Sequence, residues 1–119
     1  MELSFRKKHK TIIIMVSGEI DHHTSKELRK QTESAFIDMG LKNIIFHFEK
    51  VTFMDSSGIG MLIGRYKQLQ STGGRISVVA ANEKITEIMQ FSGLSKLIPL
   101  FDTIEDAFSY TEGREHHAV

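Results

Sequence analysis

The segment from residue 53 to 60, Phe-Met-Asp-Ser-Ser-Gly-Ile-Gly, constrains the fold of this chain most. An apolar run that suits a β-strand precedes it, and helical spacing of apolar residues follows from Gly58 to about Gln70. A strand that leads directly into a helix places the hydroxyls of Ser56 and Ser57 at the helix N-terminus. Unpaired backbone N–H groups and the positive end of the helix dipole favour an anion there. We therefore expect a phosphate, carried covalently on one of the two serines.

Strand-like and helix-like segments alternate along the rest of the chain. The expected strands cover residues 2–8, 12–17, 43–54, 75–81 and 98–101. The expected helices run from about 25 to 40, 58 to 70, 83 to 93 and 103 to 111. The order ββαβαβαβα predicts one α/β domain whose sheet is mixed but mostly parallel and begins with an antiparallel hairpin. Because Pro99 has no N–H to donate, the last strand is expected at a sheet edge.

Polar residues before the helical segments predict where each helix begins. The expected N-caps are, in chain order, Thr24 or Ser25, Ser57, Asn82, and Asp102 or Thr103. A Ser57 cap would engage its own hydroxyl with a helix N–H and leave Ser56 pointing outward. Functional groups of parallel sheets gather at the carboxyl ends of the strands, so we expect the polar loop over 19–24 and the loop over 55–57 at the same edge.

The composition limits the classes of protein that fit. With 119 residues the chain forms one domain, expected over 1–111, followed by a frayed tail over 112–119. The absence of cysteine rules out disulfides and thiolate metal sites. Fifteen basic and fifteen acidic residues give no net charge, which argues against nucleic-acid binding. No apolar run approaches the roughly 20 residues of a membrane span, and we expect a soluble, cytoplasmic protein.

Catalytic and cofactor motifs are not satisfied. The glycines at 58, 60 and 64 are spaced one residue too far for a G-x-G-x-x-G fingerprint, and no Walker sequence is present. An aspartate precedes the serines where the nucleophile elbow of a serine hydrolase needs a glycine. His22 and His23 are adjacent in a loop, where two side chains rarely converge on one metal ion. We expect no catalytic residue, no metal site and no cofactor.

The three glycines of the second helix are themselves informative. Each costs roughly 1 kcal/mol in a helix relative to alanine. Gly58, Gly60 and Gly64 fall within two turns, which indicates that another backbone or another molecule approaches this helix closely.

Three segments together resemble a known family. They are Gly-Glu-Ile-Asp-His-His-Thr over residues 18–24, Met-Asp-Ser-Ser-Gly-Ile-Gly over 54–60, and Gly-Arg-Tyr-Lys over 64–67. In this combination they closely resemble the anti-sigma factor antagonists of the STAS domain family, most strongly those of the sporulation sigma F system. The similarity extends over essentially the whole chain, includes Ser-Gly-Leu at 92–94, and is weakest after Tyr110.

The resemblance implies a partner switch and not an enzyme. The unphosphorylated antagonist of this family binds an anti-sigma factor that is also a serine kinase, and the sigma factor is released. The kinase phosphorylates the first serine of the pair, which is Ser56 here, the complex dissociates, and a serine phosphatase restores the antagonist. On this basis Asp21 and Asp55 are expected to flank the acceptor and to orient it or contact the kinase. The expected contact platform comprises Ser57, Gly58, Ile59 and Gly60.

Two other classes of function stay open at this point. Asp55 follows a strand and Glu19 and Asp21 follow another, which is typical of a phospho-accepting receiver domain, although no lysine ends the strand expected over 75–81. The chain could also be a STAS module that binds a nucleotide directly. The chemistry of the phosphate and direct binding measurements separate these classes.

Overall fold

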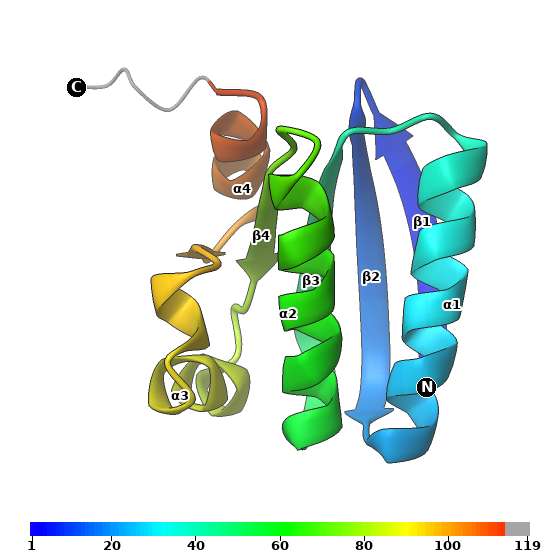
Figure 1. The fold of residues 1–119 in the computed structure, drawn as a ribbon. Helices are drawn as coiled ribbons and strands as arrows, with labels where there is room; N and C mark the ends of the chain where they lie inside the picture. The colour runs from blue at the N-terminus through cyan, green and yellow to red at the C-terminus, as the bar shows by residue number, and fades with distance from the viewer. Residues whose placement is uncertain (114–119) are drawn as a thin grey trace.

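The computed structural model describes residues 1–113 as a five-stranded sheet with helices on both faces (Figure 1). The elements are β1 (Glu2–Lys8), β2 (Thr11–Ile20), α1 (His22–Asp38), β3 (Asn43–Met54), α2 (Ser56–Gln70), β4 (Ile76–Val79), α3 (Glu83–Phe91), the 3₁₀ turn η1 (Leu94–Lys96), β5 (Leu100–Phe101) and α4 (Ile104–Thr111). The predicted order ββαβαβαβα is confirmed, and only the 3₁₀ turn was not foreseen. Residues 114–119, most of the predicted tail, lie outside the described residues.

The sheet has the sequential strand order β1-β2-β3-β4-β5. Strands β1 and β2 pair in antiparallel fashion and every later pair is parallel, as the alternation of strands and helices predicts. The two-residue strand β5 lies at the edge, directly after Pro99, which confirms the expectation from the missing N–H.

Two apolar layers fill the two faces of the sheet. Helices α1, α2 and α3 pack on one face, where Leu28, Leu62 and Ile85 are fully buried against alternate residues of β2, β3 and β4. Helix α4 covers part of the other face through Ala107 and Phe108. Because both faces are covered in this region, the strands read as nearly continuous apolar runs and not as strict alternation.

Strand β2 is longer than its sequence pattern predicts. The expectation that it ends before a loop over 19–24 is wrong, because Glu19 and Ile20 still pair with Phe53 and Met54 of β3. Gly18 has a φ of +96° and lies at a register shift, so this glycine bends the strand without ending it. Ile20 is fully buried, and this burial favours continuation of the strand into the core.

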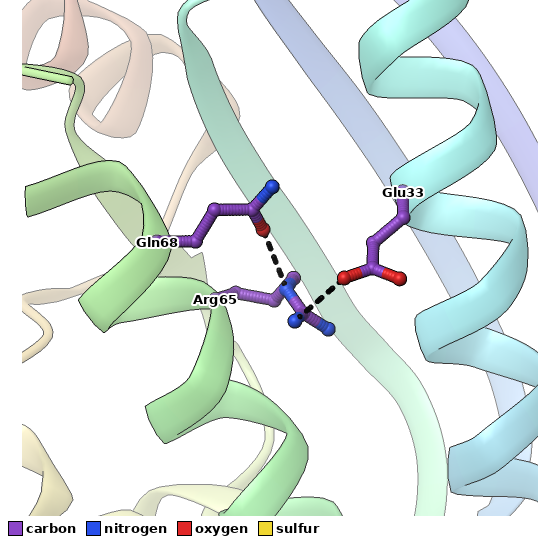
Figure 2. A network of polar contacts seen from close by, with 3 residues as sticks. All are labelled: Glu33, Arg65 and Gln68. Atoms are coloured by element: carbon purple, nitrogen blue, oxygen red, sulfur yellow. Dashed lines mark hydrogen bonds and ion pairs between the residues drawn. The ribbon is translucent and has the colours of Figure 1, made fainter. Parts of the chain in front are cut away.

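An ion pair connects α1 and α2 (Figure 2). Arg65 of α2 donates from Nη2 to Glu33 Oε2 of α1 at 3.0 Å and from Nε to Gln68 Oε1 at 3.0 Å. Only 8% of the Arg65 side chain is exposed, and this burial lowers the pKa of Arg65 while Glu33 opposes that change. Separation of α1 from α2 would leave the buried Arg65 charge without its counter-ion Glu33. The ion pair therefore favours the observed arrangement of the two helices.

The residue that follows α4, Glu112, lies beside the start of β2. Thr11 Oγ1 donates to Glu112 Oε2 at 2.9 Å, so the first residue of the predicted tail is joined to the start of β2. No helix in the described part of the chain is both long and apolar enough to pass through a bilayer.

Candidate functional site

The carboxyl ends of β2 and β3 bring the two polar loops together, as the sequence predicts. Ile20 pairs with Met54, and the Asp55 N–H donates to the Ile20 carbonyl at 3.1 Å. One residue after each strand a helix begins, α1 after Asp21 and α2 after Asp55. The N-termini of α1 and α2 therefore lie next to each other at the lower edge of the sheet in Figure 1.

Asp55 caps α2, so the expectation of a Ser57 cap is wrong. Asp55 has an extended backbone, and its Oδ1 accepts a hydrogen bond from the Ser57 N–H at 2.8 Å. Its carbonyl accepts from the N–H groups of Gly58 at 3.0 Å and Ile59 at 3.3 Å. Aspartate caps as well as serine does, and its charge suits the positive end of the helix dipole, so the first capable residue after the strand takes the position.

Asp21 caps α1, and the expected cap at Thr24 or Ser25 is wrong for the same reason. The Asp21 carboxylate accepts from the N–H groups of His23 at 3.0 Å and Thr24 at 2.9 Å. The Thr24 hydroxyl also lies within hydrogen-bonding distance of the Asp21 carboxylate, donates to the Glu19 carbonyl at 2.8 Å and accepts from the Asp21 N–H at 2.8 Å. These bonds complete a capping box, and the Thr24 N–H and hydroxyl lower the pKa of Asp21 below its usual value.

The two serines differ in what surrounds them. Ser56 is the first residue of α2 and is exposed, and its hydroxyl makes no hydrogen bond to any residue between 1 and 113. Ser57 is half-buried, and its Oγ lies 3.5 Å from Nδ1 of His22, the first residue of α1. Neither aspartate carboxylate bonds the Ser56 hydroxyl within the described chain, so both aspartates act through the helix caps.

The glycines of α2 face opposite surroundings. A β-carbon added at Gly58 would collide with the Met54 side chain and meet Ile20 Cγ2 at 3.0 Å. Gly58 is thus required by packing within this chain. An added β-carbon at Gly60 or Gly64 would meet nothing within 4 Å, so these two leave a smooth, open strip on the helix. The predicted close approach is intramolecular at Gly58 and leaves room for another molecule at the other two.

The predicted site residues lie close together at the starts of α1 and α2 but differ in their surroundings. Asp21 and Asp55 hold the two helix starts, Gly58 is buried beneath them, and Ile59 packs its half-buried side chain on the core. Ser56 and Gly60 are the exposed members. No group of three or more His, Asp or Glu side chains in the described chain could hold a metal ion.

Sequence reasoning missed His22 and Phe53. His22 was assigned no role, although its ring faces Ser57 across the two helix starts. Phe53 is 41% exposed near the end of β3, so a large apolar side chain lies three residues before Ser56. The contact between His22 and Ser57 could have been inferred from the parallel pairing of β2 and β3, because this pairing brings the residue after Asp21 next to the residues after Asp55.

Comparison with known proteins identifies the family. The STAS domain profile matches residues 2–107. An anti-sigma F factor antagonist of Paenibacillus polymyxa is 34% identical over 114 residues, which are 94% of this chain and 97% of that protein. Another, from Lysinibacillus sphaericus, is 34% identical over 84 residues, 71% of this chain and 72% of that protein. The chain belongs to the STAS domain family, and the resemblance seen in its sequence motifs is confirmed.

Solved structures of SpoIIAA, one unphosphorylated and one phosphorylated, also align with this chain. The anti-sigma factor antagonist SpoIIAA in its unphosphorylated form aligns with a TM-score of 0.73 and 28% identity, over 94% of this chain and 99% of that chain. The phosphorylated form of SpoIIAA from Bacillus aligns with a TM-score of 0.70 and 30% identity, over 92% of this chain and 98% of that chain. Within the STAS family the fold is therefore that of SpoIIAA.

Proposed function

We propose that this chain is an anti-sigma factor antagonist that works by partner switching, with Ser56 as its phosphoacceptor. The unphosphorylated chain binds an anti-sigma factor with serine kinase activity and so releases the sigma factor. Phosphorylation of Ser56 ends the binding, and a serine phosphatase restores it. The observation that carries the proposal is the exposed, unbonded Ser56 hydroxyl at the first position of α2.

The relatives support this assignment. Two antagonists of anti-sigma F factor share 34% of their aligned residues with this chain. SpoIIAA is known in both an unphosphorylated and a phosphorylated form, and both align with this fold over more than nine-tenths of the chain. From the antagonists of anti-sigma F factor we take sigma F as the sigma factor of this system. Sporulation as its process and the cytoplasm as its location are part of our proposal.

The position of Ser56 explains how one phosphate could act as a switch. A phosphoserine adds about −1.5 to −2 charges at neutral pH. On the free protein this charge lies at the N-terminus of α2, where the helix dipole favours an anion and solvent is available. The free protein therefore tolerates the phosphate without a change of backbone.

The same charge is unfavourable once a partner covers it. A charge that is desolvated and unpaired in an interface costs about 2–5 kcal/mol, which corresponds to roughly 30- to 4000-fold in affinity. Both nearby carboxylates, Asp21 and Asp55, are acidic and already engaged as caps, so neither can neutralise it. Repulsion and desolvation at the interface, and not refolding, thus separate the two proteins.

The docking platform in this proposal surrounds Ser56. It comprises Ser57, Ile59 and Gly60 of the first α2 turns, framed by Asp21 and Asp55, while the buried Gly58, also predicted as a contact, lets the helix start pack on Met54 beneath this surface. The open strip at Gly60 admits a partner close to the helix backbone, and the exposed Phe53 supplies apolar area beside it. In this function the chain is a substrate and a ligand and not a catalyst.

The test is phosphorylation by the candidate kinase. Purified protein is mixed with ATP and the anti-sigma factor, and the modified residue is located by mass spectrometry. We expect phosphate on Ser56, and we expect Ser56→Ala to remain unlabelled and bound to the anti-sigma factor.

Two results would contradict the proposal. Label that persists in Ser56→Ala would exclude Ser56 as the acceptor. Label that hydroxylamine removes would indicate an acyl phosphate on Asp55, the receiver-type alternative. The structure gives Asp55 a different role, because its Oδ1 already accepts the Ser57 N–H.

A further inference from the structure

Two adjacent serine hydroxyls, those of Ser56 and Ser57, lie at the start of α2, and the proposed function requires the kinase to phosphorylate only Ser56. Kinase action on either would be the same chemistry. The serine Oγ forms a bond to the γ-phosphorus of ATP, the bond from that phosphorus to the β–γ bridging oxygen breaks, ADP leaves, and the hydroxyl proton passes to the base of the kinase. Position within the antagonist must therefore favour one hydroxyl over the other.

We propose that His22 is a positioning residue that engages the Ser57 hydroxyl and thereby confines phosphorylation to Ser56. His22 Nδ1 lies 3.5 Å from Ser57 Oγ. An Nδ1 without a proton accepts from the Ser57 hydroxyl, and an Nδ1–H donates to the hydroxyl oxygen, so either tautomer can form the contact. The inference rests on the proposed function and assigns a role in it to a residue outside the acceptor segment.

The fold holds the two side chains in register. His22 follows Asp21, whose carboxylate closes the first turn of α1, and the Ser57 N–H is held by Asp55. The strands that carry these turns are joined by the bond from the Asp55 N–H to the Ile20 carbonyl. The facing of His22 and Ser57 is thus set by backbone contacts and not by their own weak bond.

The surroundings of the serines agree with this division. Ser57 is half-buried and has both its N–H and its hydroxyl engaged, whereas Ser56 is exposed with a free hydroxyl. A kinase can thus take the Ser56 hydroxyl without breaking a contact, but must break one to take Ser57. A Ser–His contact can also activate a serine, but that role needs an acidic group to orient the ring. Within residues 1–113, no carboxylate bonds the His22 ring.

The decisive experiment compares Ser56→Ala with the double variant Ser56→Ala/His22→Ala, each incubated with ATP and the anti-sigma kinase. Fragment-ion mass spectrometry then measures the label on Ser57. Loss of one hydrogen bond is worth about 1 kcal/mol, so we expect about fivefold more Ser57 label in the double variant. In a Ser56-containing background, His22→Ala should raise the ratio of Ser57 to Ser56 label by a similar factor.

Matched variants separate this role from a general effect on folding. His23→Ala removes the adjacent exposed imidazole, whose side chain makes no hydrogen bond or ion pair in residues 1–113 and interacts with Asp21 only through its charge, and should leave the ratio unchanged. His22→Asn keeps a hydrogen-bonding atom near the position of Nδ1 and should restore selectivity. A loss of stability alone would change total label and not its distribution between the serines.

The outcomes distinguish this inference from the function on which it rests. If the wild-type chain takes no label at all, the proposed function fails. If wild type is labelled on Ser56 but removal of His22 leaves Ser57 label unchanged or lowers it, the positioning role is overturned while the function stands.

Discussion

Helices α1 and α2 begin one residue after neighbouring strands, each with an aspartate cap, yet their first turns present different polar surfaces. In α1 the third residue is Thr24, whose hydroxyl returns to Asp21 and closes a capping box. In α2 the third residue is Gly58, which has no side chain to do so, and Asp55 makes a single side-chain bond. The polar groups at the start of α1 therefore bond to one another, whereas the Ser56 hydroxyl at the start of α2 stays free to meet another molecule.

The position of a hydroxyl within the first helical turn thus decides whether it bonds to the helix cap or stays free. A hydroxyl at the third position of a helix points back to the cap, as in a capping box. Ser56 stands at the first position, where its side chain has no cap to reach and remains exposed. Two helix starts with the same strand–aspartate–helix connection thus differ in whether a hydroxyl stays free, and the proposed function uses the free one.

The largest effect is expected from a permanent charge at the open helix start. Ser56→Asp should weaken binding to the anti-sigma factor by at least roughly 30-fold, because the carboxylate is desolvated in the interface. Titration calorimetry with the purified partner measures it. Ser71→Asp places the same charge at the other end of α2 and should bind normally. Equal affinities for wild type and Ser56→Asp would contradict the charge mechanism.

The next largest effect is expected on stability, from substitutions of Gly58 on the buried side of the α2 start and of Gly60 on its exposed side. Gly58→Ala should lower the free energy of unfolding by about 1–3 kcal/mol, because the new methyl group collides with Met54. Gly60→Ala should raise it by about 0.5–1 kcal/mol, since the methyl group meets no atom and glycine is unfavourable in a helix. Urea unfolding of the two variants gives both values, and a shift of the same sign in both would refute the contrast.

Removal of each cap tests the two starts directly. Asp55→Ala should cost about 1 kcal/mol of stability, the usual value for a lost N-cap. Asp21→Ala should lower the melting temperature further, because it dismantles a capping box with several bonds and not one. Thermal unfolding followed by circular dichroism ranks the two. The reverse ranking would mean that the α2 cap is the more strongly coupled to the sheet.

The smallest effect is a dependence of stability on pH. The Thr24 N–H and hydroxyl hold the pKa of Asp21 below its ordinary value of 3.8. Because the folded-state pKa is the lower one, the stabilisation is present above the unfolded-state pKa and is lost as the pH falls through the folded-state value. Urea midpoints measured between about pH 5 and pH 2.5 should therefore fall less steeply for Asp21→Asn than for wild type, since asparagine still caps but does not titrate.

Periodicity and turn residues in the sequence predicted the fold well. The alternation of strands and helices predicted the element order, and Pro99 predicted the edge strand. Asn82 was identified correctly as a helix cap, and Thr103 was one of the two candidates for the last one. The start of α1 and α2 was misplaced by up to four residues. Asp, Ser and Thr cap about equally well, so a run of them does not show which one follows the strand until the strand end is known.

The structure confirms that the two polar loops lie at one edge of the sheet, but their side-chain contacts were not predicted. The serines and aspartates could be placed at one edge because parallel strands bring their carboxyl ends together. The contact between His22 and Ser57 joins residues 35 positions apart and depends on the pairing of Ile20 with Met54, which no local pattern specifies. The burial of Gly58 likewise depends on side chains from two strands.

The last hydrogen bond between the β2 and β3 segments, from the Asp55 N–H to the Ile20 carbonyl, holds the residue before Ser56 against the end of β2. A loop tethered to the end of a central strand has already lost most of its conformational freedom before any enzyme arrives. Recognition of such a residue depends on the shape of a folded surface assembled from two distant segments. If the proposed phosphorylation of Ser56 is correct, a short linear peptide copied from residues 53–60 lacks that surface and is expected to be a far poorer kinase substrate than the intact domain.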